Sequence, residues 1–294
     1  MANLKAIRIR ISSVKSTRQI TSAMKMVSAA RLRKAQDKIV RLRPYANKLH
    51  EIQVGLSQSL ADSEVENIYG RVSSPQKILL VVITSNRGLC GAFNANVIKE
   101  AKRVISEEYR EQLKQGNLSI LTIGKKGFDF FKKQKINLLA EQSELLNDLS
   151  FDNSVVLAEQ VMDSFASGEF DRIELIYNRF KNAAVQDLTN EVFLPVQSVN
   201  DEKSGGTPAD YIYEPNEVDI IQELIPKSLK IQFYKAVLNS FVAEHGARMT
   251  AMHKATDNAT SLIRDLTLQY NKARQAAITN QILEVVSGAE ALRG

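Results

Sequence analysis

The feature that most constrains the fold is the lack of helix-breaking residues at both ends of the chain. Residues 1–43 contain neither glycine nor proline, and the stretch from Pro226 to Val286 contains one glycine, Gly246, and no further proline. Because these two residues most disfavour a helix interior, each end is predicted to form one long helix. About sixty helical residues span roughly 90 Å, more than the width of a globular domain. The second helix therefore cannot be packed inside a compact fold.

The first helix carries the apolar pattern of a coiled coil. Apolar residues recur at spacings of three and four in one heptad phase: Leu4, Ile7, Ile11 and Val14, then Leu32, Ala35, Ile39, Leu42, Ala46 and Leu49. The in-phase positions between these two stretches are polar: Arg18, Thr21, Lys25 and Ser28. A displaced stripe of Ile20, Met24 and Val27 lies beside them. The seam is therefore expected to lose its apolar continuity there, and a partner other than an ordinary helix is expected to face this segment.

The second helix offers a matching stripe that thins to alanine and would let a neighbouring helix approach closely: Phe233, Val237, Phe241, Ala251, Ala255, Leu262, Leu266, Tyr270, Ala273 and Ala277. Winding the two terminal helices together, antiparallel and left-handed, is the simplest way to bury both stripes. The sequence thus predicts a long coiled-coil shaft with a further domain on its side.

The middle of the chain alternates between strand and helix patterns. Strands are predicted at 77–84, 118–124, 136–141, 171–180 and 191–197. Helices are predicted at 94–115, at 127–134 and at 150–168, the last capped by Ser150 or Asp152. Such alternation implies a mainly parallel sheet with right-handed crossovers. The fold class is α/β: a long antiparallel coiled coil with a Rossmann-like α/β domain. The expected boundaries are 1–60 and 216–290 for the helices, 75–198 for the α/β domain and 199–215 for an exposed loop.

Charge is distributed unevenly along the chain. Residues 1–43 carry 12 Lys or Arg and one acid, and residues 227–294 carry 9 basic and 5 acidic residues, although the net charge of the whole chain is only +6. The middle is therefore acidic. A basic helix of this kind could bind nucleic acid, but it lacks interleaved aromatic residues. A basic shaft held by acidic protein loops fits the charges equally well, so composition leaves both possibilities open.

The stretch that most resembles an active site is TSNRGLCGAFNAN, residues 84–96, which contains the only cysteine, Cys90. A cysteine at a glycine-rich turn from strand to helix can be a nucleophile, but Ala92 stands where the elbow pattern requires glycine. The candidate bases all lie on or beside the terminal helices: His50, His245 and His253. A small buried residue at a tight turn is the favoured interpretation of Cys90.

Phosphate and metal sites are also disfavoured. Neither 84–96 nor GKKG at 124–127 has the lysine and hydroxyl of a phosphate loop or three spaced glycines, so no nucleotide is expected to bind. His245 and His253 lie about 80° apart around a helix and have no third ligand at ligand spacing. No cofactor or metal is expected. No stretch approaches 18 consecutive uncharged residues, so a membrane span is not expected either. The arginine-rich start could pass for a targeting peptide, but its helical pattern continues without a break.

Several stretches resemble one family. YNKARQAAITNQILEVVSGAEAL, residues 270–292, is similar to the signature of the γ subunit of F-type ATP synthases. The stretches that resemble the same family elsewhere are MANLKAIRIRI, TRQITSAMKMVSAARLRKAQ, TSNRGLCGAFN, DYIYEP at 210–215 and ARMTAMHKATDNA at 247–259. The resemblance covers the full length, and the chain is identified as a member of this family, of the bacterial type.

The resemblance implies a rotating central stalk. In this family the two terminal helices turn inside a hexamer of three α and three β subunits, and the α/β domain sits at the foot beside ε and the ring of c subunits. ATP is made or hydrolysed on β, so no catalytic site is expected in this chain. Ion flow drives the rotation, and the complex is expected at the cytoplasmic face of the bacterial inner membrane.

The resemblance also implies residue roles. Met24 and Lys25 match the place where an acidic loop of β pushes the shaft, and Arg274 and Gln275 match positions that meet loops of β higher up. The tip is expected to turn in an apolar sleeve through Val285, Val286 and Leu292, where uncharged contacts are favoured. Tyr213 and Glu214 match the foot on the c ring. The chain departs from the family at Gln281, where glutamate is usual, so a salt link expected there becomes at best a neutral hydrogen bond.

Overall fold

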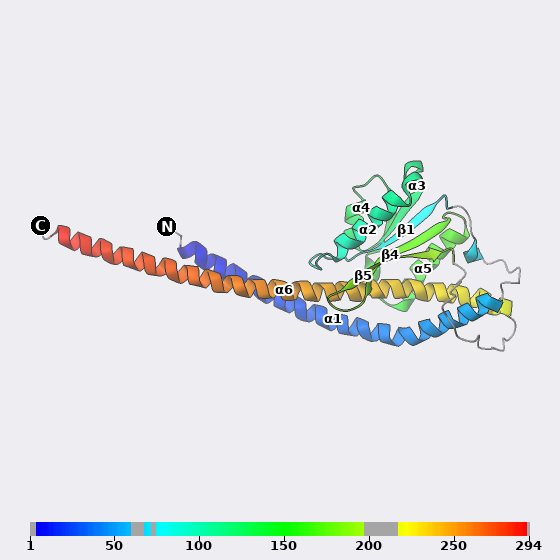
Figure 1. The fold of residues 1–294 in the computed structure, drawn as a ribbon, viewed down its shortest axis with the longest axis horizontal. Helices are drawn as coiled ribbons and strands as arrows, with labels where there is room; N and C mark the ends of the chain where they lie inside the picture. The colour runs from blue at the N-terminus through cyan, green and yellow to red at the C-terminus, as the bar shows by residue number, and fades with distance from the viewer. Residues whose placement is uncertain (1–3, 60–67, 72–74, 197–216, 293–294) are drawn as a thin grey trace. The chain divides into compact units, whose positions relative to one another are not determined.

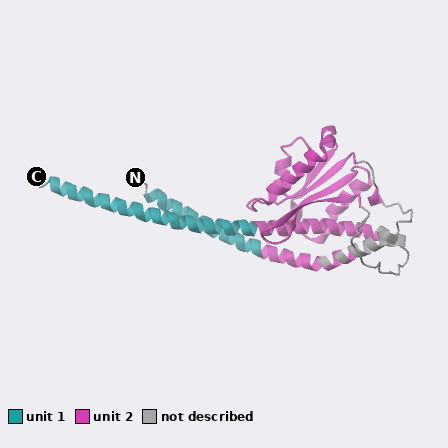
Figure 2. Cartoon of the chain, viewed as in Figure 1, with its two compact units in different colours: residues 1–29, 248–294 teal, residues 30–247 magenta. Residues whose placement is uncertain are grey.

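A computed structural model describes residues 4–59, 68–71, 75–196 and 217–292. The predicted loop at 199–215, with Tyr213 and Glu214, lies outside the described residues. The chain divides into two compact units, which Figure 2 shows in different colours. Unit 1 consists of residues 1–29 and 248–294, and unit 2 consists of residues 30–247.

Two long helices contribute to both units (Figure 1). Helix α1 spans Leu4–Ser59 and contains Pro44, and helix α6 spans Glu217–Ala291 and contains Pro226. Helix α6 therefore begins ahead of Pro226, next to the expected boundary at residue 216 and before the proline-free stretch that indicated the helix. An interior proline removes a backbone hydrogen bond, at a cost of about 3 kcal/mol or more. In α6 the residues that follow Pro226 are held by tertiary packing, because Leu229 and Phe233 are buried.

Unit 2 is built on a five-stranded sheet of order β3-β2-β1-β4-β5. The strands span Ile78–Ile83 (β1), Leu118–Ile123 (β2), Asn137–Glu141 (β3), Arg172–Phe180 (β4) and Gln186–Leu194 (β5). Strands β1 to β4 pair in parallel, and β5 runs antiparallel to β4. All six residues of β1 and of β2 are buried, as expected for central strands covered on both faces. The predicted mainly parallel sheet is confirmed, although β5 begins five residues before the predicted strand.

The shorter helices are α2 (Phe93–Glu107), α3 (Arg110–Gln115), α4 (Lys125–Phe131) and α5 (Phe151–Ala166), with 3-10 turns η1 at Ile68–Gly70 and η2 at Glu144–Leu146. Ser150 caps α5, since its side chain accepts a hydrogen bond from the Asn153 amide. The single helix predicted at 94–115 is wrong, because the chain breaks at Tyr109 between α2 and α3. Tyr109 is buried, and its hydroxyl donates to Glu174 of β4. The break in the helix lets the Tyr109 side chain turn toward the sheet and make this contact.

Glu174 is a buried carboxylate, 1% exposed, in the middle of the sheet. Besides Tyr109, it accepts hydrogen bonds from Arg172 Nε at 2.7 Å and Asn190 Nδ2 at 2.9 Å. A buried charge is tolerated only when it is paired and hydrogen-bonded in this way. Burial, and next the hydrogen bond to Glu174, raise the pKa of Tyr109 above its ordinary value of 10.0.

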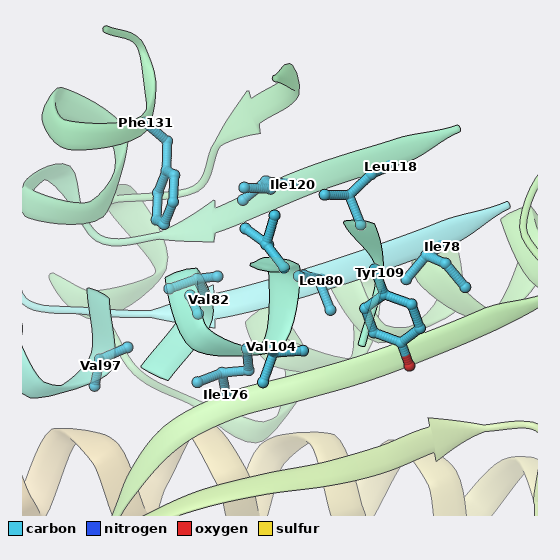
Figure 3. Packing of buried hydrophobic residues seen from close by; sticks show 12 residues of the cluster. Ile78, Leu80, Val82, Val97, Val104, Tyr109, Leu118, Ile120, Phe131 and Ile176 are labelled. Carbon is cyan, nitrogen blue, oxygen red and sulfur yellow. The ribbon is translucent and has the colours of Figure 1, made fainter. Parts of the chain in front are cut away.

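The apolar core of unit 2 lies between the sheet and helices on both of its faces. Figure 3 shows Ile78, Leu80 and Val82 of β1 with Val97 and Val104 of α2. On the other side, Phe193 of β5 lies with its ring centroid 5.8 Å from that of Phe233 in α6. Each fully buried apolar side chain contributes about 1.5–3 kcal/mol. The sheet therefore holds the first part of α6 as part of its own core.

Candidate functional site

In unit 1, the start of α1 lies antiparallel to the last part of α6 (Figures 1 and 2). The two helices meet at Thr21 and Thr256, whose hydroxyls are 2.9 Å apart and share a hydrogen bond. Met252, Ala259 and Leu266 of α6 are also buried. The predicted antiparallel pairing of the terminal helices is thus confirmed in this unit.

The heptad seam keeps its phase through the polar positions. Thr21 is 8% exposed and Ser28 is 3% exposed, whereas Ile20 and Val27 of the displaced stripe are 61% and 55% exposed. We expected a partner other than an ordinary helix to face this segment. At the seam positions Thr21 and Ser28 this expectation was wrong, because α6 faces them. Ser28 can be buried because its hydroxyl donates to the Met24 carbonyl oxygen of its own helix at 2.8 Å. The Thr21 hydroxyl has acceptors on both helices, the Arg18 carbonyl oxygen at 3.1 Å and the Thr256 hydroxyl at 2.9 Å. Small hydroxyl residues thereby replace apolar ones without a buried unpaired donor.

The outward face of α1 combines apolar and basic side chains. Ile20, Met26 and Val27 are all more than half exposed. The predicted contact residues are both half-buried: Met24 belongs to the displaced stripe, and Lys25 is an in-phase position of the seam. Residues 4–29 contain six Lys or Arg and no acid. A surface of this kind favours an acidic partner that also offers apolar contacts.

The second predicted contact pair lies at another level of α6. Arg274 and Gln275 are both exposed. Arg274 comes 18 residues after Thr256, which places it about 27 Å further along the helix. Met24 lies just beyond Thr21 in the opposite direction, so the two predicted contact pairs are roughly 30 Å apart. The structure does not bring them together, and a single small partner could not touch both.

The end of α6 is the most exposed apolar segment in unit 1. Every residue from 278 to 292 is exposed, including the predicted tip residues Val285 at 72%, Val286 at 49% and Leu292 at 90%. Sequence reasoning missed three further apolar residues that extend this surface: Ile278, Ile282 and Leu283. The spacing of four between Ile278 and Ile282, which places them on one helix face, was a readable signal. An exposed apolar surface of this length marks an interaction site.

The stretch that resembles an active site is closed. Cys90 is 1% exposed, and its Sγ accepts a hydrogen bond from Asn94 Nδ2 at 3.2 Å. It packs with Phe93 and with Ala243 of α6. The predicted buried position of Cys90 at a tight turn is confirmed, and the same contacts hold the β1–α2 turn against α6 within unit 2.

The glycines of the GKKG stretch serve close packing. Gly124 has a φ of +108°, and a Cβ placed on it would lie 2.3 Å from the Thr84 carbonyl oxygen. The Gly127 amide donates to the Thr84 hydroxyl at 2.8 Å. These residues bring the start of α4 against the end of β1. Among the residues that the structure describes, no three His, Cys, Asp or Glu side chains group as metal ligands. None of the described helices is long and apolar enough to cross a membrane.

Comparison with known proteins identifies the family. A family model described as ATP synthase matches residues 3–292. The ATP synthase gamma chain of Flavobacterium psychrophilum is 54% identical over 294 residues, and that of Flavobacterium johnsoniae is 55% identical over 295 residues. Each comparison covers 100% of both chains. The chain belongs to the ATP synthase γ-chain family. The resemblance inferred from the C-terminal signature is therefore confirmed over the full length.

Solved structures confirm the fold of this γ chain. A chain of the Euglena gracilis mitochondrial ATP synthase, in a structure of OSCP, F1 and c-ring, matches with a TM-score of 0.68 and 23% identity. It covers 98% of this chain and 94% of its own length. A chain of the Tetrahymena thermophila central stalk and c-ring matches with a TM-score of 0.59 and 24% identity, covering 80% of this chain and 99% of its own. The predicted fold class, with two long terminal helices and a mainly parallel sheet, is confirmed.

Proposed function

We propose that this γ chain is the rotating shaft of an F-type ATP synthase and couples ion-driven rotation of a c ring to ATP synthesis or hydrolysis on three β subunits. The observation that carries the proposal is the exposed apolar end of α6, residues 278–292. This end lies beyond the part of α6 that pairs with α1 through the seam at Thr21 and Thr256. A helix end of this kind requires a surrounding partner in water, because its apolar side chains are otherwise hydrated. The similar solved structures are described as rotor and central-stalk assemblies.

The torque contacts are proposed at two levels. Met24 and Lys25 would meet an acidic loop of β beside the exposed Ile20 and Val27. Arg274 and Gln275 would meet loops of β roughly 30 Å higher, in keeping with their exposure on α6. Basic groups on a shaft attract acidic loops through solvent without demanding one fixed geometry, because long-range electrostatics steers the contact. Such contacts can pass from one β subunit to the next.

The tip is proposed to turn in an apolar sleeve formed by the α and β subunits. Val285, Val286 and Leu292 would lie against this sleeve, together with Ile282 and Leu283. Apolar contacts are non-directional, so they change little as the helix rotates. A charged side chain would instead lose its hydration without a fixed partner. The exposed Gln281, where glutamate is usual in the family, is expected to make at most a neutral hydrogen bond.

The remaining partners belong to the foot and the membrane. The foot of the chain would bind ε and the c ring, with Tyr213 and Glu214 in contact with the ring. The chain itself would carry no catalytic site and bind no nucleotide, in keeping with the closed packing around Cys90 and Gly124. The complex would be peripheral at the cytoplasmic face of the bacterial inner membrane. The alternative of a basic nucleic-acid-binding coiled coil finds no support in the comparisons, which all concern ATP synthase chains.

A crosslinking experiment in the assembled complex tests the rotary contact. With Cys90→Ser as background, Lys25→Cys or Arg274→Cys is crosslinked to a cysteine in β under different nucleotide conditions. One of the three β subunits is labelled, so that exchange of partners during turnover can be followed. Rotation predicts that the crosslink appears in labelled and unlabelled β after turnover, and that it blocks hydrolysis until reduced. Contacts that stay with one β subunit throughout turnover would contradict the proposal.

The Cys90→Ser variant is also a test by itself. Serine has the same shape as cysteine, is slightly smaller and can also accept from Asn94, so hydrolysis by the assembled complex is expected to stay within about twofold of the parent. Circular dichroism checks that the variant folds. Complete loss of turnover in a folded, assembled variant would revive the idea of a thiol enzyme.

A further inference from the structure

Unit 2 contains a hollow of about 240 Å³ that none of the predicted contact residues lines. Its walls come from α1, from the segment between η2 and α5, and from α6. Leu149 and Leu238 form part of its floor and are 7% and 0% exposed, and Phe241 is half-buried beside them. The hollow therefore has an apolar floor that belongs to the packed interior of the unit.

The rim of the hollow is basic. Arg31, Lys34 and Lys38 follow one another at spacings of three and four on α1, so they lie on one face of that helix. The Lys38 ammonium donates to the Leu149 carbonyl oxygen at 2.8 Å, which holds it over the floor. Arg31 and Lys34 make no hydrogen bond or ion pair with the residues that the structure describes. One acid, Asp148, also lines the hollow. The rim thus carries an excess of positive charge.

We propose that this hollow binds a small amphiphilic anion, with a carboxylate or similar head group on Arg31 and Lys34 and a short hydrocarbon body on Leu149, Leu238 and Phe241. The charge of the rim selects an anion, and the floor selects an apolar body. The volume lies below the range of roughly 300–1,000 Å³ typical of drug-sized pockets, so the body must be short. A neutral molecule of the same body, or an inorganic anion without one, would satisfy only half of the site.

Decanoate serves as the probe, and the full chain labelled with ¹³C at leucine methyl groups serves as the receptor. Titration is expected to shift the methyl signals of Leu149 and Leu238 in a saturable way, whereas those of Leu80 in the sheet core stay unchanged. Decanol, which has the same body without charge, is expected to bind at least about tenfold more weakly. Equal affinity for decanol, or no saturable shift at Leu149 and Leu238 with decanoate, would overturn the proposal.

The matched variants are Arg31→Gln with Lys34→Gln, and Arg33→Gln with Arg41→Gln as control. Both pairs remove two exposed positive charges from α1, but Arg33 and Arg41 do not line the hollow. The first pair is expected to weaken decanoate binding about tenfold, and the control pair to leave it unchanged. The Leu80 methyl signals report that each variant is folded. Equal losses in both pairs would mean that overall charge, and not this rim, attracts the anion, and would overturn the assignment.

Discussion

All six residues of strand β1 in unit 2 are buried, whereas every residue from 278 to 292 at the end of α6 in unit 1 is exposed. Both segments contain a run of aliphatic side chains, ILLVVI in one and ILEVV within the other. The segments differ in whether other parts of the same chain bury their apolar side chains. A central strand of a parallel sheet is covered by helices on both faces. The end of α6 extends beyond the start of α1, so its apolar side chains are left for contact with another molecule. The apolar residues of strand β1 thus contribute to the stability of unit 2, whereas those at the end of α6 in unit 1 are exposed for binding to other subunits.

The largest expected effect lies in the core of unit 2. Phe233 of α6 is 0% exposed and packs against Phe193, so Phe233→Ala should lower the free energy of unfolding by about 3–5 kcal/mol. Urea denaturation followed by circular dichroism measures this loss. Leu283→Ala in unit 1, at a side chain 57% exposed, should change the same quantity by no more than about 0.5 kcal/mol. Similar losses at both positions would break the comparison between the units.

The buried polar network of unit 2 should give the next largest effect. Tyr109→Phe removes one of the donors to the buried Glu174 and is expected to cost about 1–3 kcal/mol of unfolding free energy. Tyr45→Phe, at an exposed tyrosine, is the matched control and should cost nothing measurable. Denaturation midpoints of the two variants at pH 7 test this difference.

The same tyrosine makes stability depend on pH. Burial and the contact with Glu174 raise the pKa of Tyr109 above the ordinary 10.0. A raised pKa means that the folded chain keeps this proton after the unfolded chain has released it. The contribution is therefore fully present below pH 10 and is lost as the pH rises above it. In denaturation series from pH 9 to pH 11, the Tyr109→Phe variant should lose stability less steeply than the parent, and parallel curves would refute the assignment.

The polar seam of unit 1 should give a smaller effect. Thr21→Val and Thr256→Val each keep the shape of the side chain and remove the shared hydrogen bond. A double-mutant cycle is expected to give a coupling energy of about 0.5–1.5 kcal/mol. Because Met252, Ala259 and Leu266 of α6 also pack in this unit, the helix pair should stay assembled in each variant. A coupling energy of zero would mean that the seam is held by packing alone.

The smallest effect on the free chain is expected at the tip. Val285→Thr with Val286→Thr keeps the β-branched shape, so the unfolding free energy should change by less than about 0.5 kcal/mol. Binding to the α and β subunits should nevertheless weaken, because hydroxyls would enter an apolar sleeve. Val40→Thr, at a valine 65% exposed in unit 2, is the control for both measurements. Unchanged assembly in the tip variant would show that these side chains do not enter an apolar sleeve.

The long helices and the parallel strands could be predicted because local patterns specify them: glycine-free and proline-free ends, and buried aliphatic runs between helices. The break at Tyr109 could not, because it depends on a carboxylate that comes 65 residues later in the chain. Helix α6 also continues through Pro226, because tertiary packing offsets the local penalty of a proline inside a helix. Among the site residues, the exposure of Val285, Val286 and Leu292 follows from their place beyond the paired part of α6.

The sequence by itself determined that two long amphipathic helices flank an α/β domain, and its signature stretches determined the family. Only the tertiary structure decided which face of α1 closes the seam. In the sequence, heptad phase favoured the hydroxyls of Thr21 and Ser28 at the seam, whereas hydrophobicity favoured the displaced stripe through Ile20 and Val27. The close fit of Thr21 against Thr256 settled the choice, because small side chains that satisfy their own hydroxyls let two helices approach. The larger apolar side chains were thereby left on the outer surface, where a partner can reach them.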